Sequence, residues 1–166
     1  MADTVGFSSL YADDKPARYA ELLPQLAALV DGEPDLIANL ANAAAAIRAC
    51  ATGASWVGFY IVRGDELVLG PFQGNVACVR IARGRGVCGT AWVERRTLIV
   101  PDVTRFPGHI ACDAGSRSEI VVPIFVASRS EPVAVLDVDS YAVAAFDEHD
   151  AAGLEPVAAL LGSLAW

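Results

Sequence analysis

Residues 56–62 read Trp56-Val57-Gly58-Phe59-Tyr60-Ile61-Val62, a run of aromatic and β-branched side chains that is typical of a strand. The run ends at the turn signal Arg63-Gly64-Asp65, and a second apolar run follows at residues 67–69. Two such runs on either side of a short turn predict a β-hairpin. We therefore expect a fold built around an antiparallel sheet.

Four further segments are expected to extend this sheet, at residues 77–81, 98–100, 119–126 and 132–138. The last two are joined by the polar turn at 128–131. Glycine and proline clusters at 70–74, 84–89 and 101–108 interrupt the strands, and we expect them to form loops around a pocket. The prediction is a mainly antiparallel central sheet of about five or six strands.

Helices are predicted on both sides of the strand region. Residues 16–30 place leucines at helical spacing, with Pro16 near the start and Gly32 just past the end. An alanine-rich second helix is expected at 34–47. A closing helix is expected to begin near Asp147 and Glu148 and to bury Leu154, Val157, Leu161 and Leu164. Helices that flank a run of strands indicate the α+β class.

Length and composition indicate one folded domain over residues 1–166, with a flexible or loosely packed segment at 1–15. The chain has no apolar run of the roughly 18 residues that a membrane helix needs, and its start lacks the features of a signal peptide, so we expect a cytoplasmic protein. A net charge of -8 argues against nucleic acid and anionic membranes as partners. The local basic group, Arg80, Arg83, Arg85, Arg95 and Arg96, is interpreted as solvated surface.

Four cysteines are present, and in a reducing compartment they are expected to be thiols for chemistry or metal binding. Cys112 lies in a small polar loop, where an exposed thiol without a purpose would risk oxidation, so we predict a function for it. Cys78 lies in a strand candidate and Cys88 in a glycine-rich segment, and the three could converge. Cys50, at the end of an alanine-rich helix, is interpreted as a small buried hydrophobe.

Two alternatives for these segments are disfavoured. No two cysteines stand at C-x-x-C spacing, and His109 and His149 form no ligand pair with them, so we expect no metal. Residues 84–89 match G-x-G-x-x-G, with Asp102 at the distance of a ribose-binding acid. That motif requires a parallel βαβ unit, which a mainly antiparallel sheet does not supply.

Acidic and aromatic side chains form a second candidate group. Asp137 and Asp139 alternate with a valine, so they share one face of a strand, and Glu119 begins the strand expected to pair with it. Such acids need a cationic partner or a shared proton, and an ammonium ligand would satisfy them; the alternative is a solvated strand end. Trp56 and Tyr60 also share a face, as core residues or as an aromatic wall around an apolar methyl group.

The sequence resembles the free methionine-R-sulfoxide reductases, a family of stand-alone GAF-fold enzymes, from Tyr19 to about Leu161. The matching segments are 38–42, 56–60, 70–74, 78–81, 86–89, 118–123, 136–140 and 146–148. The cysteines at positions 78, 88 and 112 stand in the family's order and spacing. Cys50 is an extra cysteine, and Gly115 and Arg117 depart from the pattern expected in the catalytic loop.

The resemblance implies a GAF-like fold, with terminal helices on one face of the sheet and pocket loops on the other. It implies reduction of free L-methionine-(R)-S-oxide, with Cys112 as the nucleophile, Cys78 as the first resolving thiol, and Cys88 able to relay or replace it. It further implies that the two aromatic residues enclose the substrate methyl group.

The three acids, Glu119, Asp137 and Asp139, are implied to bind the substrate's ammonium group and sulfoxide oxygen. Glu119 is the expected proton donor. A sulfenic acid on the nucleophile then condenses to a disulfide, which thioredoxin with NADPH and thioredoxin reductase recycles, so no bound cofactor is expected. A role in oxidative stress and a homodimer are further expectations. The main alternative is a non-catalytic ligand sensor, because a GAF fold alone does not define an activity.

Overall fold

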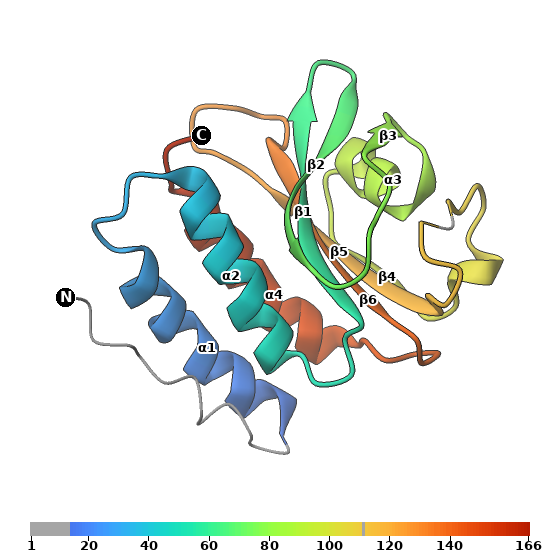
Figure 1. Cartoon of the computed structure of the whole chain (residues 1–166), viewed down its shortest axis with the longest axis horizontal. Coiled ribbons are helices and arrows are strands. Elements are labelled where there is room, and N and C mark those ends of the chain that lie inside the picture. The colour runs from blue at the N-terminus through green and yellow to red at the C-terminus, as the bar shows by residue number, and fades with distance from the viewer. Residues whose placement is uncertain (1–13, 111) are drawn as a thin grey trace.

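The computed structural model describes residues 14–110 and 112–166, so the predicted flexibility of 1–15 concerns a segment that lies almost wholly outside the described residues. Within them, six strands form one sheet in the order β3-β2-β1-β6-β5-β4 (Figure 1). The strands are β1 (Trp56–Arg63), β2 (Glu66–Gln73), β3 (Arg80–Ala82), β4 (Leu98–Val100), β5 (Ser118–Ile124) and β6 (Ala134–Ser140). Every neighbouring pair is antiparallel, which confirms the predicted α+β class and the antiparallel sheet.

Three helices, α1 (Lys15–Val30), α2 (Leu36–Cys50) and α4 (Glu148–Gly162), lie together on one face of the sheet (Figure 1). Helix α3 (Gly86–Glu94) and the loops around it lie on the other face. Leu164 is not part of the closing helix as predicted; it follows the helix end and packs partly buried against the core. None of the helices in the described ranges is long and apolar enough to cross a membrane.

Aspartates cap the three helices of the first face. The side chain of Asp14 accepts a hydrogen bond from the Ala17 amide, and Asp35 accepts one from the Ala38 amide. Asp147 forms a capping box with Asp150 at the start of α4. These carboxylates satisfy amides that have no partner within the helix and complement the positive end of the helix dipole, so each helix has a defined first turn.

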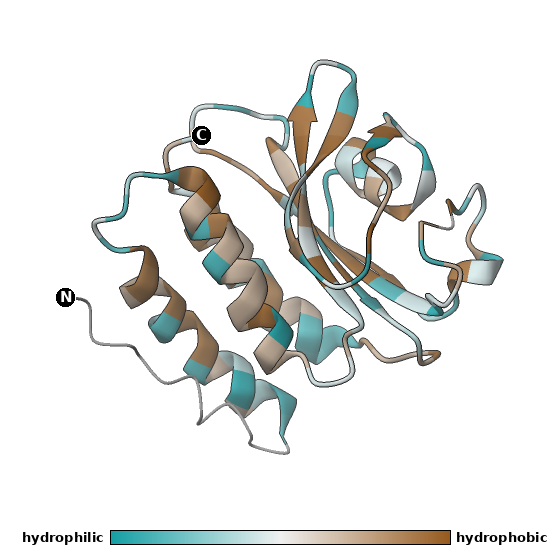
Figure 2. Cartoon of the chain, viewed as in Figure 1, coloured by the Kyte–Doolittle hydropathy of each residue, from teal (hydrophilic) through white to brown (hydrophobic). Residues whose placement is uncertain are grey.

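The main core lies between these helices and the sheet, and Figure 2 shows the apolar residues along both. Leu22, Leu26 and Ile47 are fully buried on the helices, where the helical spacing predicted them. In β6, Leu136 and Val138 belong to this core, whereas Val135 belongs to a second cluster on the opposite face. The alternation of strand side chains therefore assigns one face of β6 to the helical core and the other to the site.

Two predicted boundaries around the hairpin are wrong. Strand β2 continues through Gly70 and Pro71, which the sequence placed in a loop. The register of β1 and β2 shifts between Gly58 and Tyr60, so Gly70 and Pro71 of β2 lie at a β-bulge. Proline is tolerated there because the regular hydrogen-bond ladder is interrupted. Strand β3 begins only at Arg80, so the predicted strand at 77–81 was placed too early.

Candidate active site

A cavity of about 50 Å³ opens between the second face of the sheet, α3 and the loops at 76–77 and 109–116. The predicted residues that line it are Trp56, Tyr60, Cys88, Cys112, Glu119, Asp137 and Asp139. The strands supply the acidic and aromatic side chains, while α3 and the loops supply the cysteines. The structure therefore brings together the predicted site residues from segments far apart in the sequence.

A disulfide joins Cys78 and Cys112 beside this cavity, and their Cα atoms are 5.2 Å apart. Both residues lie in loops and are partly exposed, so they are accessible to a small thiol or to a reductant. Cys78 lies just before β3 and not within a strand, contrary to the sequence interpretation. The bond links distant positions of the chain and therefore ties two loops of the cavity rim to each other.

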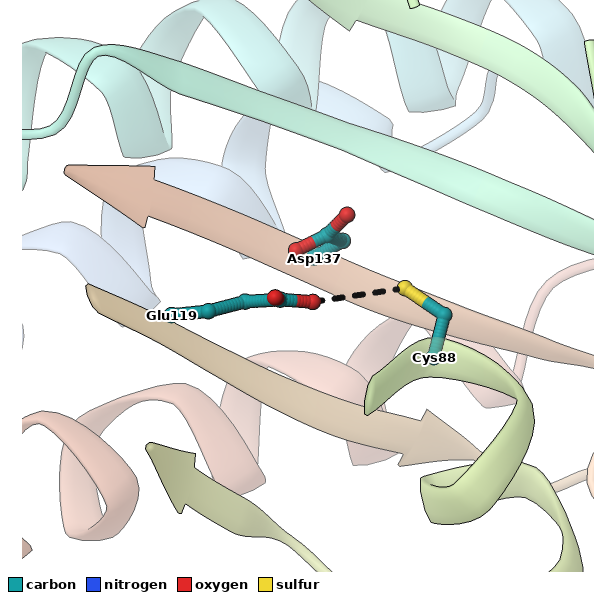
Figure 3. A group of neighbouring side chains, drawn as sticks. All are labelled: Cys88, Glu119 and Asp137. Carbon is teal, nitrogen blue, oxygen red and sulfur yellow. Dashed lines mark hydrogen bonds between the residues drawn. The ribbon is translucent and has the colours of Figure 1, made fainter. Parts of the chain in front are cut away.

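The other two cysteines are free and buried in different environments. Cys50 lies at the end of α2 within the helical core, as its alanine-rich surroundings predicted. Cys88 lies in the first turn of α3, and its Sγ donates a hydrogen bond to Oε1 of Glu119 at 3.7 Å (Figure 3). Burial raises the pKa of the Cys88 thiol well above its ordinary value, and the nearby Asp137 and Glu119 raise it further. The thiol form is therefore strongly favoured when Cys78 and Cys112 are joined.

The three predicted acids lie next to each other on β5 and β6. Glu119 is directly opposite Asp139 in the register, and Asp137 is opposite Val121. Burial raises the pKa of Glu119 and of Asp137 well above their ordinary values, and repulsion from Asp139 adds to both shifts. These two acids are therefore held in the protonated form and can donate protons.

Asp139 is less shielded than its two neighbours. Burial raises its pKa to about 6, while a hydrogen bond from the Ser116 hydroxyl at 2.7 Å opposes the shift. None of the ion pairs among the described residues involves Glu119, Asp137 or Asp139. Glu119 and Asp137 are neutral in the protonated form, whereas Asp139, with a pKa of about 6, is ionised at neutral pH and has no ion-pair partner among the described residues, so the cavity is suited to a ligand with a positive charge.

Trp56 and Tyr60 stack with ring centroids 6.0 Å apart, and Phe72 also stacks on Trp56, with ring centroids 5.4 Å apart. Gly58 makes this arrangement possible, because a Cβ at that position would collide with the Trp56 ring and with Phe72. The Tyr60 hydroxyl donates to the carbonyl oxygen of Cys78 at 3.0 Å, which fixes the ring relative to the disulfide loop. The two rings are buried, as the core alternative predicted, and they also line the cavity.

Sequence reasoning missed several residues of the site. Ser116 is buried and binds Asp139, but nothing in its sequence position distinguishes it. Asp113 accepts a hydrogen bond from the Tyr141 hydroxyl at 2.8 Å, which links the Cys112 loop to the segment after β6. His109 lines the cavity, and burial lowers its pKa. Only the general expectation that loops surround a pocket pointed to these positions.

The arginines predicted to be solvated surface separate into two groups. Four of them form surface ion pairs: Arg80 with Glu66, Arg83 and Arg95 with Glu131, and Arg96 with Glu94. The fifth, Arg85, is the N-cap residue of α3 and lines the cavity, so it differs from the others in position.

The G-x-G-x-x-G match at 84–89 has a packing reason. A Cβ on Gly89 would come within 2.8 Å of the carbonyl oxygen of Ala82, so only glycine allows α3 to lie this close to β3. The strands before and after α3, β3 and β4, are at opposite edges of the sheet. The described part of the chain therefore does not contain the parallel βαβ unit that a dinucleotide site of this type requires.

The fold and the cavity on the second face of the sheet define a GAF domain. The family model described as GAF domain matches residues 35–164, and the chain belongs to that family. This confirms the predicted GAF-like arrangement, with terminal helices on one face and loops on the other.

Individual relatives narrow the family further. The free methionine-R-sulfoxide reductase of Escherichia coli (strain K12) is 46% identical over 148 residues, which cover 89% of this chain and 88% of the relative. The enzyme of the same name from Saccharomyces cerevisiae is 42% identical and covers 96% of this chain and 91% of its own length. The X-ray structure of the free methionine-R-sulfoxide reductase of Neisseria meningitidis, in complex with its substrate, is 52% identical with a TM-score of 0.86, covering 91% of this chain and 90% of that chain. The chain therefore belongs to the free methionine-R-sulfoxide reductase family of oxidoreductases, as the sequence resemblance predicted.

Proposed function

We propose that this chain reduces free L-methionine-(R)-S-oxide to L-methionine in the cytoplasm, with Cys112 as the nucleophile. The observation that carries the proposal is the disulfide between Cys112 and Cys78 beside a cavity with three acids and an aromatic wall. A bond between two partly exposed cysteines at a cavity is the expected product of a thiol reductase cycle. The names of the relatives support the choice of substrate.

The first step transfers the sulfoxide oxygen to Cys112. The Cys112 thiolate attacks the sulfoxide group of the substrate, and Glu119 donates a proton to the sulfoxide oxygen. Glu119 has this proton to give because burial holds its pKa well above the ordinary value. The bond between the substrate's sulfur and oxygen breaks, and a new sulfur–oxygen bond forms on Cys112. The substrate gains two electrons and leaves as methionine, while Cys112 is oxidised to a sulfenic acid.

The second step closes the disulfide. The Cys78 thiol attacks the sulfenic sulfur of Cys112, and the hydroxyl group of the sulfenic acid leaves as water with the proton of the Cys78 thiol. A thioredoxin-type dithiol, itself reduced by NADPH and thioredoxin reductase, then restores both thiols by exchange. Cys88 lines the same cavity, so it serves as a reserve resolving thiol after a movement of the Cys112 loop. The cycle needs no bound cofactor.

The remaining groups select the substrate. Trp56 and Tyr60 enclose the methyl group, because stacked rings offer an apolar wall. Asp137 and Asp139 bind the ammonium group: its positive charge compensates Asp139, whose pKa of about 6 leaves it ionised at neutral pH, and Oδ1 of Asp137 accepts a hydrogen bond. A methionine sulfoxide within a peptide lacks the free ammonium group, which accounts for the restriction to the free amino acid.

Single-turnover experiments test this proposal. The fully reduced protein is mixed with free (R)-methionine sulfoxide without a recycling reductant, and methionine is counted per chain. We expect about one equivalent from the wild type and from Cys78→Ser, and none from Cys112→Ser. Cys50→Ala is the control, because its thiol lies on the other face of the sheet and should not change the yield.

A normal yield from Cys112→Ser would refute the assignment of the nucleophile. Binding of the sulfoxide without any methionine formed by the wild type would instead support the ligand-sensor alternative. The same assay with the (S) isomer and with a peptide-bound sulfoxide should give no product. With a thioredoxin system added, the wild type should continue to turn over and Cys78→Ser should slow sharply after the first equivalent.

A further inference from the structure

Three side chains from separate elements meet at the inner end of the cavity: Cys88 from α3, Glu119 from β5 and Asp137 from β6 (Figure 3). One sulfur or oxygen atom of each lies within 4.8 Å of the corresponding atoms of the other two. Their exposed fractions are only 3%, 6% and 6%. The three groups are therefore a compact, shielded set of donor atoms that all become anionic when deprotonated.

Asp137 is incompletely satisfied in this arrangement. Its Oδ1 atom is buried and has no hydrogen-bond partner among the described residues. A buried acceptor without a partner destabilises the folded state, so native proteins rarely keep one without a reason. This oxygen belongs to a residue in the wall of the cavity and is available to a ligand that offers a positive charge.

The spacing of the donor atoms suits a tetrahedral thiophilic cation. With a zinc–sulfur bond of about 2.3 Å and a zinc–oxygen bond of about 2.0 Å, a tetrahedral site separates the sulfur and the oxygen by about 3.5 Å. The observed distance from Cys88 Sγ to Glu119 Oε1 is 3.7 Å. Mg²⁺ and Ca²⁺ do not fit as well, because both require several oxygen ligands and neither favours a thiolate.

We propose that Cys88, Glu119 and Asp137 form a binding site for a thiophilic divalent cation of the Zn²⁺ type. Water in the cavity supplies the fourth ligand, as in zinc sites that have three protein ligands. The cation takes the place of the protons on the three groups, so binding releases protons, and the cation-bound form lacks the Glu119 proton that the proposed reduction uses. The site does not depend on the redox cycle, because Cys88 remains a free thiol when Cys78 and Cys112 are joined.

The prediction from sequence that no metal binds rested on C-x-x-C spacing and on histidine pairs. The ligands proposed here stand at positions 88, 119 and 137, far apart in the chain, and belong to no such pattern. Only the packing of α3 against β5 and β6 brings them together.

A titration of the disulfide form with Cd²⁺ tests this inference. Cd²⁺ bound to a thiolate absorbs in the ultraviolet by charge transfer, and the disulfide form offers only Cys88 and Cys50 as thiols. We expect one equivalent to bind to the wild type and to Cys50→Ala, with displacement by Zn²⁺ and none by Mg²⁺. Cys88→Ser should lose the absorption band, and Asp137→Asn should bind at least about tenfold more weakly.

Folding of each variant is checked by far-ultraviolet circular dichroism, and Asp137→Asn keeps the shape of the side chain. A band that persists in Cys88→Ser or disappears in Cys50→Ala would overturn the assignment, as would the absence of binding to the folded wild type. Equal affinity of wild type and Asp137→Asn would remove Asp137 from the site and refute the three-ligand proposal. The titration involves no turnover, so its failure would leave the proposed reductase activity intact.

Discussion

Replacement of Asp139 by asparagine should stabilise the protein, although the residue lies in the site. In the folded chain the pKa of Asp139 is raised to about 6, chiefly by burial, against an ordinary value of 3.8. Below pH 3.8 the carboxyl group is protonated in both the folded and the unfolded chain, so it does not change the free energy of unfolding. As the pH rises, the unfolded chain ionises first, so the folded state loses relative stability until its own carboxyl ionises near pH 6.

The magnitude follows from the size of the pKa shift. Each pKa unit corresponds to about 1.4 kcal/mol, so the raised pKa of Asp139 lowers the free energy of unfolding by about 3 kcal/mol at pH 7 and above. Because Asp139 is only partly buried, screening by solvent reduces this destabilisation. We therefore expect Asp139→Asn to raise the free energy of unfolding by about 1 to 3 kcal/mol.

Urea unfolding of the disulfide form at several pH values between 4 and 8 measures this effect. The difference between the variant and the wild type should be small at pH 4, should grow up to about pH 6 and should then level off. Asp65→Asn, an exposed aspartate in the turn between β1 and β2, is the matched control and should change nothing. A variant less stable than the wild type at pH 7, or a difference independent of pH, would refute the reasoning.

Two further predictions concern the proton donor and the packing of the helices. Glu119→Gln should slow the first turnover by about 10²-fold or more. In the wild type the rate should fall once the pH passes the raised pKa of Glu119, and the variant should lack this fall. An unchanged single-turnover pH profile would exclude Glu119 as the acid. Gly153→Ala should lower the free energy of unfolding by about 1 to 3 kcal/mol, because the added Cβ would collide with Cβ, Cγ and Cδ2 of Tyr19 where α4 packs against α1. An unchanged midpoint of urea unfolding would contradict this prediction.

The helices were the most predictable part of the fold. Apolar spacing in residues 16–30 placed Leu22 and Leu26 in the core, because a helical face repeats regularly whatever it packs against. Strand ends were less predictable. Gly70 and Pro71 are local breakers, yet they lie within β2, since the bulge that accommodates them depends on how β1 pairs with it.

The site was predictable in composition more than in geometry. Alternation placed Asp137 and Asp139 on one face, because strand side chains point alternately to opposite faces. The contact between Cys88 and Glu119 was not predictable, since it depends on how closely α3 packs on the sheet. Ser116 was missed for a related reason: a serine in a polar loop becomes a partner of Asp139 only when the loop has folded back onto β6.

The alternation along β6 makes this strand sensitive to a change in length. Leu136 and Val138 fill the helical core, and the two aspartates between and beyond them face the cavity. Deletion or insertion of a single residue at the start of β6 would exchange the two sets, placing carboxylates in hydrocarbon and valine and leucine in the cavity. Natural variation in chain length among homologues should therefore be confined to the connecting segments, such as 127–132, while the length of β6 itself stays constant.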